Sequence, residues 1–502
     1  MTQAHDSPWR RWLAEDLRAY WLLWLIVAGA VALRIYALGR LPGIIGDEAW
    51  YGVQAQRLLA GTGGELRTPT GNVPGLFQLG SLSLLHAIFQ PSALLLRIPA
   101  LISSLVAIGL AYAVGRRFFG PAAGMVALVL TACLPASIVY ARFGWDPSHA
   151  SMFVLAATYA ALARRQLLSA LLFALGLANH PAALFAAPFL TLAFLGSAAE
   201  EQGWRHAFGQ CLAFVGTLLL AILLGTILSP AATHYLDVSR SLARIADGGQ
   251  WLAFSTGFLR LLSGDTVYRF VAGEGFGPWD MAIEWVMAAL LIAVVAVGLI
   301  AVRRSADRMA AGVVAGWLAS LVSLFVVAGP WAFRPGLERF GIPMLAPTAI
   351  AAAVLLARCL VDMKRVLQGI VAAIAVPMLA GFCYFYLRPL DQGAGRPPAG
   401  LWIGYPNLNQ RALEQIEAIA GPDPAVIVAE DWWIEWPVAY LANGSRFQVR
   451  AAGEPAPPGR AYWIAYRNGP LDIALSRRSD VRRQAAIESA DRKNALQIWS
   501  SR

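Results

Sequence analysis

Charged residues are scarce in this chain: they make up 14% of 502 residues, against about 25% in soluble domains. The mean hydropathy is +0.56, and apolar runs of about twenty residues, the length that crosses a bilayer, recur along most of the sequence. These features exclude a soluble globular protein and predict a polytopic, all-α membrane protein. The net charge is +10, but the basic residues fall mainly between apolar runs, so we expect no nucleic-acid partner.

Cysteine is also rare. The four cysteines all fall inside apolar segments without paired spacing, which predicts neither a disulfide framework nor a zinc site. The sequence has no GxGxxG loop or other nucleotide fingerprint. The first apolar run, about 20–38, exceeds the core of a signal peptide, so we interpret it as a retained first span.

The clusters of arginine and lysine between apolar runs predict the topology, because such clusters mark cytoplasmic loops. Residues 72–90 are apolar and long enough to cross, but a crossing there would put Arg116 and Arg117 outside. If these residues instead form an interfacial helix, the basic clusters of all later loops fall on the cytoplasmic side, together with the N-terminus. About eleven spans are then predicted: 20–38, 93–115, 121–141, one ending at 164–165, one leading out to 179–181, one returning to "EEQGWRH", 207–229, one ending at "RRSADR", one leading out to "WAFRPGLERF", one ending near "RCLVDMKR", and 367–387.

The composition changes after residue 388, where "PLDQGAGRPPAG" is typical of a linker. We therefore predict a membrane domain, 1–388, with outer loops at 41–92 and 230–280, and a small extracytoplasmic α/β domain, 389–502. In this second domain "PAVIVAED" and "RAYWIAYR" predict strands, and "NQRALEQIEAIAG" predicts an amphipathic helix ended by Gly421.

The predicted outer loops hold a distinct set of polar residues near the membrane surface. Charge near hydrocarbon is costly unless it is paired or solvated, so such residues are candidates for function. Arginines can hold phosphate oxygens, and a carboxylate can take a proton from a hydroxyl group. The pattern therefore suits a reaction on a lipid-borne phosphate. The set comprises Asp47, Glu48, Arg97, Arg142, Asp146, His149, Asn179, His180, Arg334, Glu338 and Arg339.

Each candidate has a structural alternative. Asp47 would be an N-cap for a helix over 48–60 that Gly61 closes, and Asp146, before Pro147, would cap the next span. His149 and His180 would be packing residues. The arginines Arg97 and Arg142 would extend along the apolar surface toward water. The aromatic cluster at 431–436 is interpreted as the core of the outer domain.

The order of the motifs resembles a known family. "GDEAWYGVQAQRLLAG", "VPGLFQLGSLSLLHAIF", "LLRIPALISSLVAIGLAYAVGRRFFG" and "VYARFGWDPSH" follow one another over residues 20–195, and "LERFGIPMLAPTAI" extends the likeness. They resemble the membrane glycosyltransferases of the C-type fold, in the branch of the protein O-mannosyltransferases and the lipid A aminoarabinose transferase. The chain departs from that pattern at "NVPG" and "NHP".

The resemblance implies that Asp47 is the catalytic carboxylate, with Glu48 beside it, and that Asp146 is a second functional acid. It also implies a polyprenyl-phosphate-linked sugar as donor, used on the non-cytoplasmic face of the membrane. The expected function is an inverting hexosyl- or pentosyltransferase that acts on a hydroxyl of a lipid, glycan or protein. The localisation expected is the bacterial inner membrane, and the role is cell-envelope glycan biosynthesis.

We expect five residues to contact the lipid phosphate, and no cofactor. A divalent metal at Asp47 and Asp146 is an open alternative, since hard cations prefer oxygen ligands. Two other functions also stay open: a flippase or transporter of lipid-linked sugar, and a non-catalytic membrane scaffold. The expected phosphate-binding residues are Arg97, Arg142, His149, His180 and Arg339.

Overall fold

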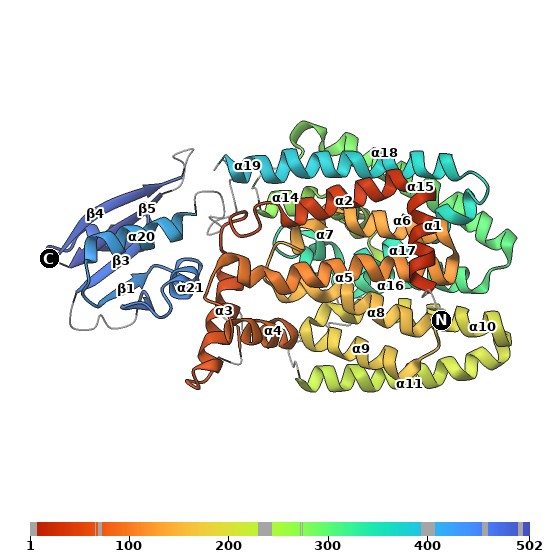
Figure 1. The fold of residues 1–502 in the computed structure, drawn as a ribbon, viewed down its shortest axis with the longest axis horizontal. Helices are drawn as coiled ribbons and strands as arrows, with labels where there is room; N and C mark the ends of the chain where they lie inside the picture. The colour runs from red at the N-terminus through yellow and green to blue at the C-terminus, as the bar shows by residue number, and fades with distance from the viewer. Residues whose placement is uncertain are drawn as a thin grey trace, which may run out of the picture.

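A helical bundle and a small α/β domain lie end to end in the computed structural model (Figure 1). The structure describes residues 8–65, 67–68, 73–228, 243–271, 273, 275–392, 407–453, 460–489 and 495–501. The predicted linker from 393 falls outside these ranges, so the domain boundary at 388/389 stays a prediction.

The bundle makes this chain a multi-pass membrane protein. In the described part of the chain, seven helices are long and apolar enough to cross a bilayer, or eight if one bent pair counts as a span. The predicted count of eleven is therefore not confirmed; two further apolar helices of the bundle, Pro121–Cys133 and Gln166–Asn179, are shorter than a full span. The helices of the bundle are α2 (Trp21–Ile35), α5 (Ala93–Phe119), α6 (Pro121–Cys133), α7 (Pro135–Tyr140), α8 (Ala150–Leu162), α9 (Gln166–Asn179), α10 (Ala187–Gln202), α11 (Trp204–Leu228), α15 (Asp280–Ser305), α16 (Arg308–Val327), α17 (Leu345–Cys359) and α18 (Lys364–Phe382), with α19 (Arg388–Asp391) at the end.

The N-terminal helix α1 (Pro8–Ala19) lies across the bundle rather than along it. It meets α2 at a bend of 101°, as expected for a segment on the membrane surface. The buried Asp16 carboxylate accepts hydrogen bonds from the Tyr112 hydroxyl (2.8 Å) and from Arg116 Nε (2.9 Å). These contacts fix α1 to the end of α5.

The first outer loop forms two short helices, α3 (Gly46–Leu59) and α4 (Leu76–His86). With 11 residues, α4 is about 16 Å long and is too short to cross a bilayer of about 30 Å. This length agrees with the interpretation of the segment as an interfacial helix, which stays a prediction. The N-cap of α3 is Ile45, and Asp47 is the second residue of the helix. The alternative that Asp47 caps α3 is therefore wrong.

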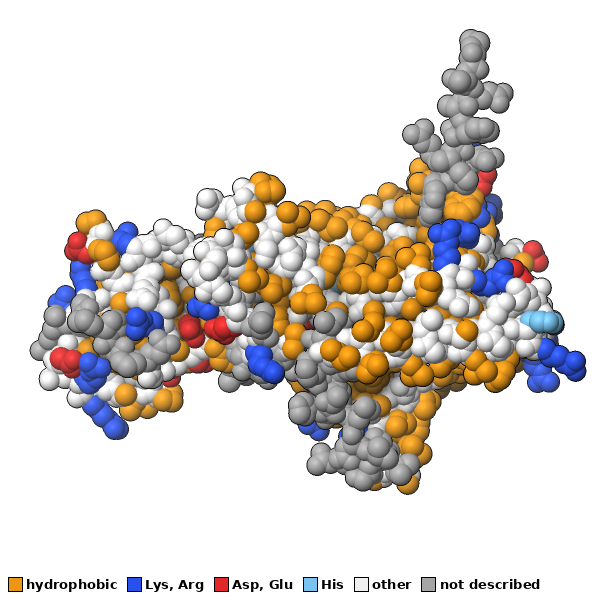
Figure 2. Space-filling model, turned by 90° about the horizontal axis from the view of Figure 1, so that it is seen from below, with side chains coloured by type: hydrophobic (Ala, Val, Ile, Leu, Met, Phe, Trp, Pro, Cys, Tyr) orange, Lys and Arg blue, Asp and Glu red, His pale blue; other side chains and the backbone are white. Residues whose placement is uncertain are grey.

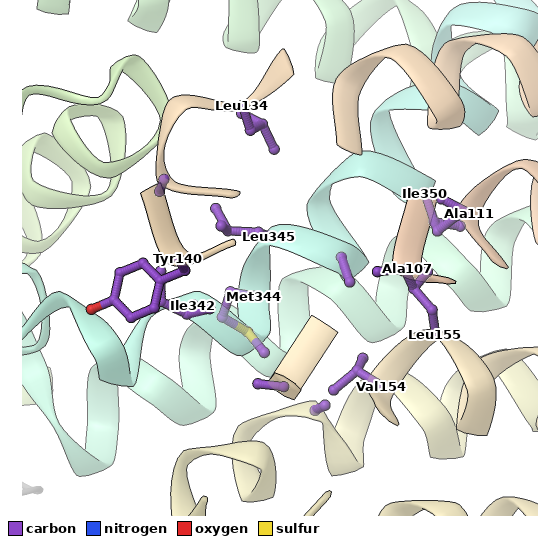
Figure 3. Packing of buried hydrophobic residues seen from close by; sticks show 14 of the residues in the cluster. Ala107, Ala111, Leu134, Tyr140, Val154, Leu155, Ile342, Met344, Leu345 and Ile350 are labelled. Atoms are coloured by element: carbon purple, nitrogen blue, oxygen red, sulfur yellow. The ribbon is translucent and has the colours of Figure 1, made fainter. Parts of the chain in front are cut away.

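Helix α17 lies at the centre of the bundle, since 94% of its apolar window is buried. Two 3₁₀ turns, η6 (Glu338–Phe340) and η7 (Ile342–Met344), lead into it. Figure 3 shows Met344 and Ile350 packed among side chains of α5 and α8, including Ala107 and Val154. The segment "LERFGIPMLAPTAI" thus places Arg339 at the end of the most buried helix.

Small residues allow the closest helix contacts. A Cβ on Gly196 of α10 would lie 3.0 Å from the Gly312 Cα of α16, and a Cβ on Gly316 would lie 2.9 Å from the Phe189 Cα. Close backbone approach at glycine is typical of membrane helices, where dispersion rather than hydrophobic burial drives association.

The predicted outer loop at 230–280 contains further helices. Its described part forms α13 (Gly248–Ser263), α14 (Asp265–Val271) and the 3₁₀ turn η4 (Gly277–Trp279). Another 3₁₀ turn, η5 (Gly329–Phe333), packs against α13. Residues 229–242 of this loop lie outside the described ranges.

The C-terminal part is a five-stranded sheet in the order β2-β1-β3-β5-β4. The pairs β1–β2 and β1–β3 are parallel, whereas β3–β5 and β4–β5 are antiparallel. The two predicted strands and the predicted helix are confirmed as β1, β3 and α20. The elements are α20 (Leu408–Ala420), β1 (Ala425–Ala429), α21 (Trp432–Leu441), β2 (Phe447–Ala451), β3 (Ala461–Tyr466), α22 (Pro470–Ser476), β4 (Val481–Glu488) and β5 (Ala495–Ser501).

Helix α21 joins the two domains by packing against α3. A Cβ on Gly46 would lie 2.9 Å from the Trp432 ring, and one on Gly52 would lie 2.5 Å from the Tyr440 ring. The side chains of Trp436 and Tyr440 belong to the buried cluster of the membrane domain. The interpretation of the 431–436 aromatics as the core of the outer domain is therefore wrong, because α21 turns them toward α3.

Surface composition agrees with insertion in a membrane. Figure 2 shows an apolar surface over the bundle between the C-terminal domain and the opposite end, where lysines and arginines gather. Several basic residues lie at the ends of bundle helices: Arg164 follows α8, Arg304 is in the last turn of α15, and Lys364 is the first residue of α18.

Candidate active site at the outer end of the bundle

Asp47 lies in the first turn of α3 and is partly exposed. Burial raises the pKa of its carboxyl group to about 6, the nearby Arg339 guanidinium lowers it, and the neighbouring Glu48 raises it. Near neutral pH this carboxyl group exchanges protons readily, which suits a general base.

Asp146 begins the 3₁₀ turn η1 (Asp146–His149) after the loop that follows α7, and it is also partly exposed. Its pKa is raised to about 7, first by burial, while Arg339 lowers it and the charge of Asp47 raises it further. The N-cap of η1 is Trp145, without a side-chain cap. Asp146 is therefore not the helix cap that was one alternative, and the two acids lie close enough to influence each other.

Gly75, the last residue of the sequence "NVPG", packs against Asp146. A Cβ on Gly75 would lie 2.5 Å from the Asp146 Cβ and 2.8 Å from the Asn179 carbonyl oxygen. The Asn179 side-chain amide donates to the Asp146 carbonyl oxygen (2.6 Å). Only glycine fits at position 75, so the segments around 75, 146 and 179 form one closely packed unit.

Arg339 faces the acid pair. Its guanidinium lies over the Trp145 ring (5.2 Å to the centroid) and beside Phe340 (5.5 Å). The Tyr140 hydroxyl donates to the buried Glu338 carboxylate (3.1 Å), and the Tyr140 ring stacks on Trp145 (6.1 Å between centroids). Within the described ranges no carboxylate lies within 4.0 Å of Arg339. Its N–H donors are thus available for an anionic ligand.

Glu48, by contrast, is fully buried and paired. Arg97 Nη2 donates to Glu48 Oε1 (2.6 Å), and Arg97 Nε donates to Oε2 (3.2 Å). The backbone N–H groups of Ile45 and Gly144 also donate to this carboxylate (3.2 and 3.0 Å). The pair is completely removed from solvent, and it connects the start of α3 to α5 and to the loop before Asp146.

Arg97 and Arg142 satisfy backbone carbonyl groups. Arg97 donates to the carbonyls of Leu38 (2.7 Å) and Gly43 (3.0 Å). Arg142 donates to the carbonyl of Leu41 (2.6 Å) and to three carbonyls near the end of α2: Leu33, Arg34 and Tyr36. Both guanidinium groups are buried, so the structure places them in the loop framework and away from the surface that a lipid phosphate would reach.

The two histidines differ in position. His149 is buried, with Nδ1 2.7 Å from the Ser103 hydroxyl and Nε2 2.6 Å from Gln78 Oε1. His180 lies next to the site, with its ring 5.8 Å from that of Phe340 and its Nδ1 accepting from the Ala182 N–H (3.2 Å). Burial lowers the pKa of both imidazoles to about 3, and Arg339 adds to the effect at His180. Neither histidine therefore adds positive charge at neutral pH.

Sequence reasoning placed neither Tyr51 nor Trp145 among the candidate site residues. Tyr51 lies beside Asp146 and lowers the pKa of that carboxyl group, and its hydroxyl accepts from the Gly75 N–H (2.7 Å). One signal was available, because Tyr51 is four residues after Asp47 and so lies on the same helix face. The position of Trp145 against Arg339 depends on contacts distant in sequence.

Arg334 is exposed and belongs to a different cavity. This cavity, of about 350 Å³, lies between α13, α14 and η5 and is also lined by Arg260 and Arg269. Both of these arginines are paired with acids, Arg260 with Glu284 and Arg269 with Asp265 and Asp280. The cavity is thus largely charge-compensated.

A metal at Asp47 and Asp146 would need further ligands. In the part of the chain that the structure describes, no group of three or more His, Cys, Asp or Glu residues could hold a metal ion. Two carboxylates together with substrate phosphate oxygens fit the way proteins hold Mg²⁺, but Arg339 already supplies positive charge beside this pair.

Comparison with known proteins finds likeness in structure and none in sequence. No protein-family model matches the chain, and no curated protein matches it. ArnT from Cupriavidus metallidurans in the apo state superposes with a TM-score of 0.56 and 12% identity, over 96% of this chain and 97% of that chain. ArnT bound to undecaprenyl phosphate gives a TM-score of 0.56 and 14% identity, over 96% and 98%. Apo oligosaccharyltransferase from Archaeoglobus fulgidus gives 0.49 and 14%, over 90% and 69%.

The first two comparisons show that the chain has the fold of ArnT over nearly its whole length. This is the C-type fold of membrane glycosyltransferases, so the fold resemblance predicted from the motifs is confirmed. The likeness also covers the C-terminal domain, since the aligned region includes 96% of the chain.

Proposed function

We propose that this protein is an inverting glycosyltransferase that moves a sugar from a polyprenyl-phosphate donor to a hydroxyl acceptor at the outer face of the membrane. The observation that carries the proposal is the arrangement of Asp47, Asp146 and Arg339, which are partly exposed and within electrostatic reach of one another. The fold shared with an enzyme solved with undecaprenyl phosphate supports the choice of donor.

In the proposed reaction, the Asp47 carboxylate takes the proton of the acceptor hydroxyl as its oxygen attacks the anomeric carbon. The bond between that carbon and the lipid phosphate breaks on the opposite face, which inverts the configuration. Arg339 binds the departing phosphate and stabilises its charge. Proton transfer to a positioned base contributes about 10²- to 10⁴-fold.

Asp146 and the Glu48–Arg97 pair have supporting roles in this proposal. Asp146 lies beside Tyr51, and both it and Asp47 are within electrostatic reach of Arg339, so Asp146 adds negative charge that attracts this cation to the site. Glu48 and Arg97 are positioning residues, because their bonds hold the start of α3 against α5. Of the five residues expected to bind phosphate, only Arg339 is retained in that role.

The outer face is the proposed side of the reaction. The site and the C-terminal domain lie at one end of the bundle, and the arginine and lysine clusters of the connecting loops lie at the other (Figures 1 and 2). Since basic loops stay cytoplasmic, the N-terminus would be cytoplasmic and the C-terminal domain extracytoplasmic.

The test is sugar transfer by the purified, lipid-reconstituted protein. A panel of radiolabelled polyprenyl-phosphate sugars, both hexosyl and pentosyl, is offered with a glycolipid extract. The parent protein should form labelled product, and Asp47→Asn should lose about 10²-fold or more. Asp480→Asn is the matched control, because Asp480 is exposed in the outer domain, is bonded to Arg478 and has no part in the proposed site.

Three outcomes distinguish the alternatives. A flippase would move the intact donor across the bilayer without product, and a scaffold would do neither. Transfer by Asp47→Asn at the parental rate would exclude Asp47 as the base. We expect EDTA to leave the rate unchanged, because Arg339 supplies the positive charge; loss of activity in EDTA that Mg²⁺ restores would assign a metal to the acid pair instead.

A further inference from the structure

Two tryptophans of the C-terminal domain lie against the helix that carries Asp47. Trp432 and Trp433 are the first two residues of α21, and Asp431 caps this helix by accepting from the N–H groups of Trp433 (3.0 Å) and Ile434 (3.3 Å). Their rings stack at 4.0 Å between centroids with 28° between planes. The cap and the stacking hold both indoles in one orientation.

The contact with α3 is immediate. A Cβ on Gly46 would lie 2.9 Å from the Trp432 ring and 3.2 Å from its carbonyl oxygen. Gly46 directly precedes Asp47, so the indole pair lies one residue from the proposed base. Arg339 reaches the same Asp47 from the membrane domain, so the carboxylate has the cation from one domain and the aromatic pair from the other.

The pair does not serve the core of its own domain. That core is formed by residues such as Ile434 and Val438 of α21, together with the sheet and α20. Trp432 and Trp433 lie outside this cluster, pack in part against the buried cluster of the membrane domain and stay partly exposed. The part of their aromatic surface that remains accessible beside a polar site suits a binding surface.

We infer that Trp432 and Trp433 form the binding surface for a pyranose ring of the acceptor, so that the acceptor is a glycan or glycolipid. One face of a pyranose presents C–H bonds whose partial positive charge is attracted to the negative face of an indole. This inference rests on the proposed function.

The position of the pair indicates the acceptor rather than the donor. In an inverting displacement the nucleophile and the leaving phosphate occupy opposite faces of the transferred sugar. Arg339, which would hold the phosphate, belongs to the membrane domain, and the indoles belong to the aqueous domain. In this proposal the acceptor sugar lies against the accessible part of the indole pair and directs its hydroxyl to the Asp47 carboxylate.

The experiment compares two acceptors with the same alkyl chain, an alkyl glycoside and an alkyl glycerol, in the reconstituted full-length protein. Trp432→Leu and Trp433→Leu should raise the KM for the alkyl glycoside about 3- to 10-fold, the size of one aromatic contact. The KM for the alkyl glycerol, the KM for the donor and the kcat should stay unchanged. The Phe variants should recover part of the loss.

Trp285→Leu is the matched control, since Trp285 is 71% exposed on α15 and has no part in the proposed site. An unchanged KM for the glycoside, an equal rise for both acceptors, or a rise in the donor KM instead would each overturn the inference. Thermal unfolding of every variant identifies a loss of fold.

A binding measurement separates this inference from the proposed function. The alkyl glycoside should bind the Asp47→Asn protein, detected by a saturation-transfer NMR titration, and should bind Asp47→Asn/Trp433→Leu about 3- to 10-fold more weakly. If the parent protein transfers no sugar, the proposed function has failed, and this comparison still decides whether the indole pair binds a pyranose. Equal binding by both proteins would contradict it.

Discussion

At the scale of single residues, Asp47 and Glu48 are neighbours in sequence with opposite environments. Asp47 is partly exposed and near Arg339, whereas Glu48 is buried and bonded to Arg97 and two backbone N–H groups. Because a buried charge needs such partners, Glu48 fixes the backbone from which Asp47 reaches the substrate. This division of roles between two adjacent carboxylates leads to two predictions.

The first prediction compares Asp47→Asn with Glu48→Gln. Asp47→Asn should abolish transfer with little change in melting temperature, because Asp47 makes no ion pair within 4.0 Å in the described structure. Glu48→Gln leaves the Arg97 charge buried without its counter-ion, which costs about 3–5 kcal/mol. Its melting temperature in detergent should fall strongly. A Glu48→Gln protein as stable as the parent would show that the pair does not anchor α3.

The second prediction concerns the pH dependence of kcat/KM. The carboxylate form of Asp47 is the active one, and burial raises its pKa to about 6. Activity should therefore be complete above this pKa and fall as the pH falls through about 6. Arg339 lowers the pKa of both Asp47 and Asp146, so Arg339→Gln should move the acid limb of the profile to higher pH.

Arg339→Lys is the control for that profile, because it keeps the positive charge and loses only the fork of donors. Its acid limb should stay close to that of the parent, even if its rate is lower. If the acid limbs of the pH profiles of Arg339→Gln and Arg339→Lys coincide, then the charge of Arg339 does not set the pKa of Asp47 and Asp146.

At the scale of elements, α3 is clamped between α5 of the membrane domain and α21 of the outer domain. Two backbone contacts at glycine make this possible, at Gly46 against Trp432 and at Gly52 against Tyr440. The Tyr440 hydroxyl also donates to the Ser92 carbonyl (3.2 Å) and accepts from the Ser92 N–H (3.1 Å), at the start of α5. Tyr440 thus contacts both helices that meet at the site.

The third prediction tests this clamp. Gly52→Ala would place a methyl group 2.5 Å from the Tyr440 ring and 2.7 Å from Leu96 Cδ2, and overpacking of this kind costs about 1–3 kcal/mol. Transfer and thermal stability should both decrease. Gly109→Ala in α5 is the control, because its added Cβ has no neighbour within 4 Å and alanine favours a helix. Equal stability of the two variants would contradict the clamp.

Sequence patterns predicted individual helices and strands better than the contacts between residues that are distant in sequence. The α20 helix and the β1 and β3 strands follow from periodicity, and the non-crossing α4 follows from Arg116 and Arg117, because a local or loop-charge signal exists for each. Glu48 and Arg97, which pair with each other, are 49 residues apart in sequence, and no periodic pattern predicts such a contact. For this reason the sequence analysis grouped Arg97 and Arg142 with Arg339 as phosphate ligands.

Arg34 shows the same limit inside the bundle. It is fully buried and was not singled out from the sequence, yet it donates to Ser104, to the carbonyls of Ala132 (2.6 Å) and Thr131 (3.3 Å), and to Ser137. Pro135 begins α7 and cannot donate an N–H to the helix before it, so Arg34 replaces a lost partner. The helix interruption at Pro135 is visible in the sequence, but the sequence does not indicate that Arg34 supplies the missing hydrogen bonds.

At the scale of the whole molecule, the two ends of the bundle differ in charge and in the domain they carry. The fourth prediction follows from this difference. In a variant with its four cysteines replaced by alanine, Asn443→Cys in the outer domain should react with a membrane-impermeant maleimide in intact cells. His206→Cys at the opposite end should react only after permeabilisation. Both positions are exposed, so accessibility within the protein does not decide the result, and the reverse labelling would invert the proposed orientation.

The packing of α21 on α3 also has a consequence for the order of biosynthesis. Ribosomes make α3 among the first elements of the chain, whereas α21 is made among the last and, in the proposed orientation, must first be exported across the membrane. Until it arrives, the apolar face of α3 that receives Trp436 and Tyr440 has no cover, and the indole pair is absent from the side of Asp47. A nascent chain would therefore contain Asp47 early and would gain Trp432 and Trp433, the proposed acceptor-binding pair, last. In the proposed orientation, transfer would begin only after translocation of the C-terminal domain.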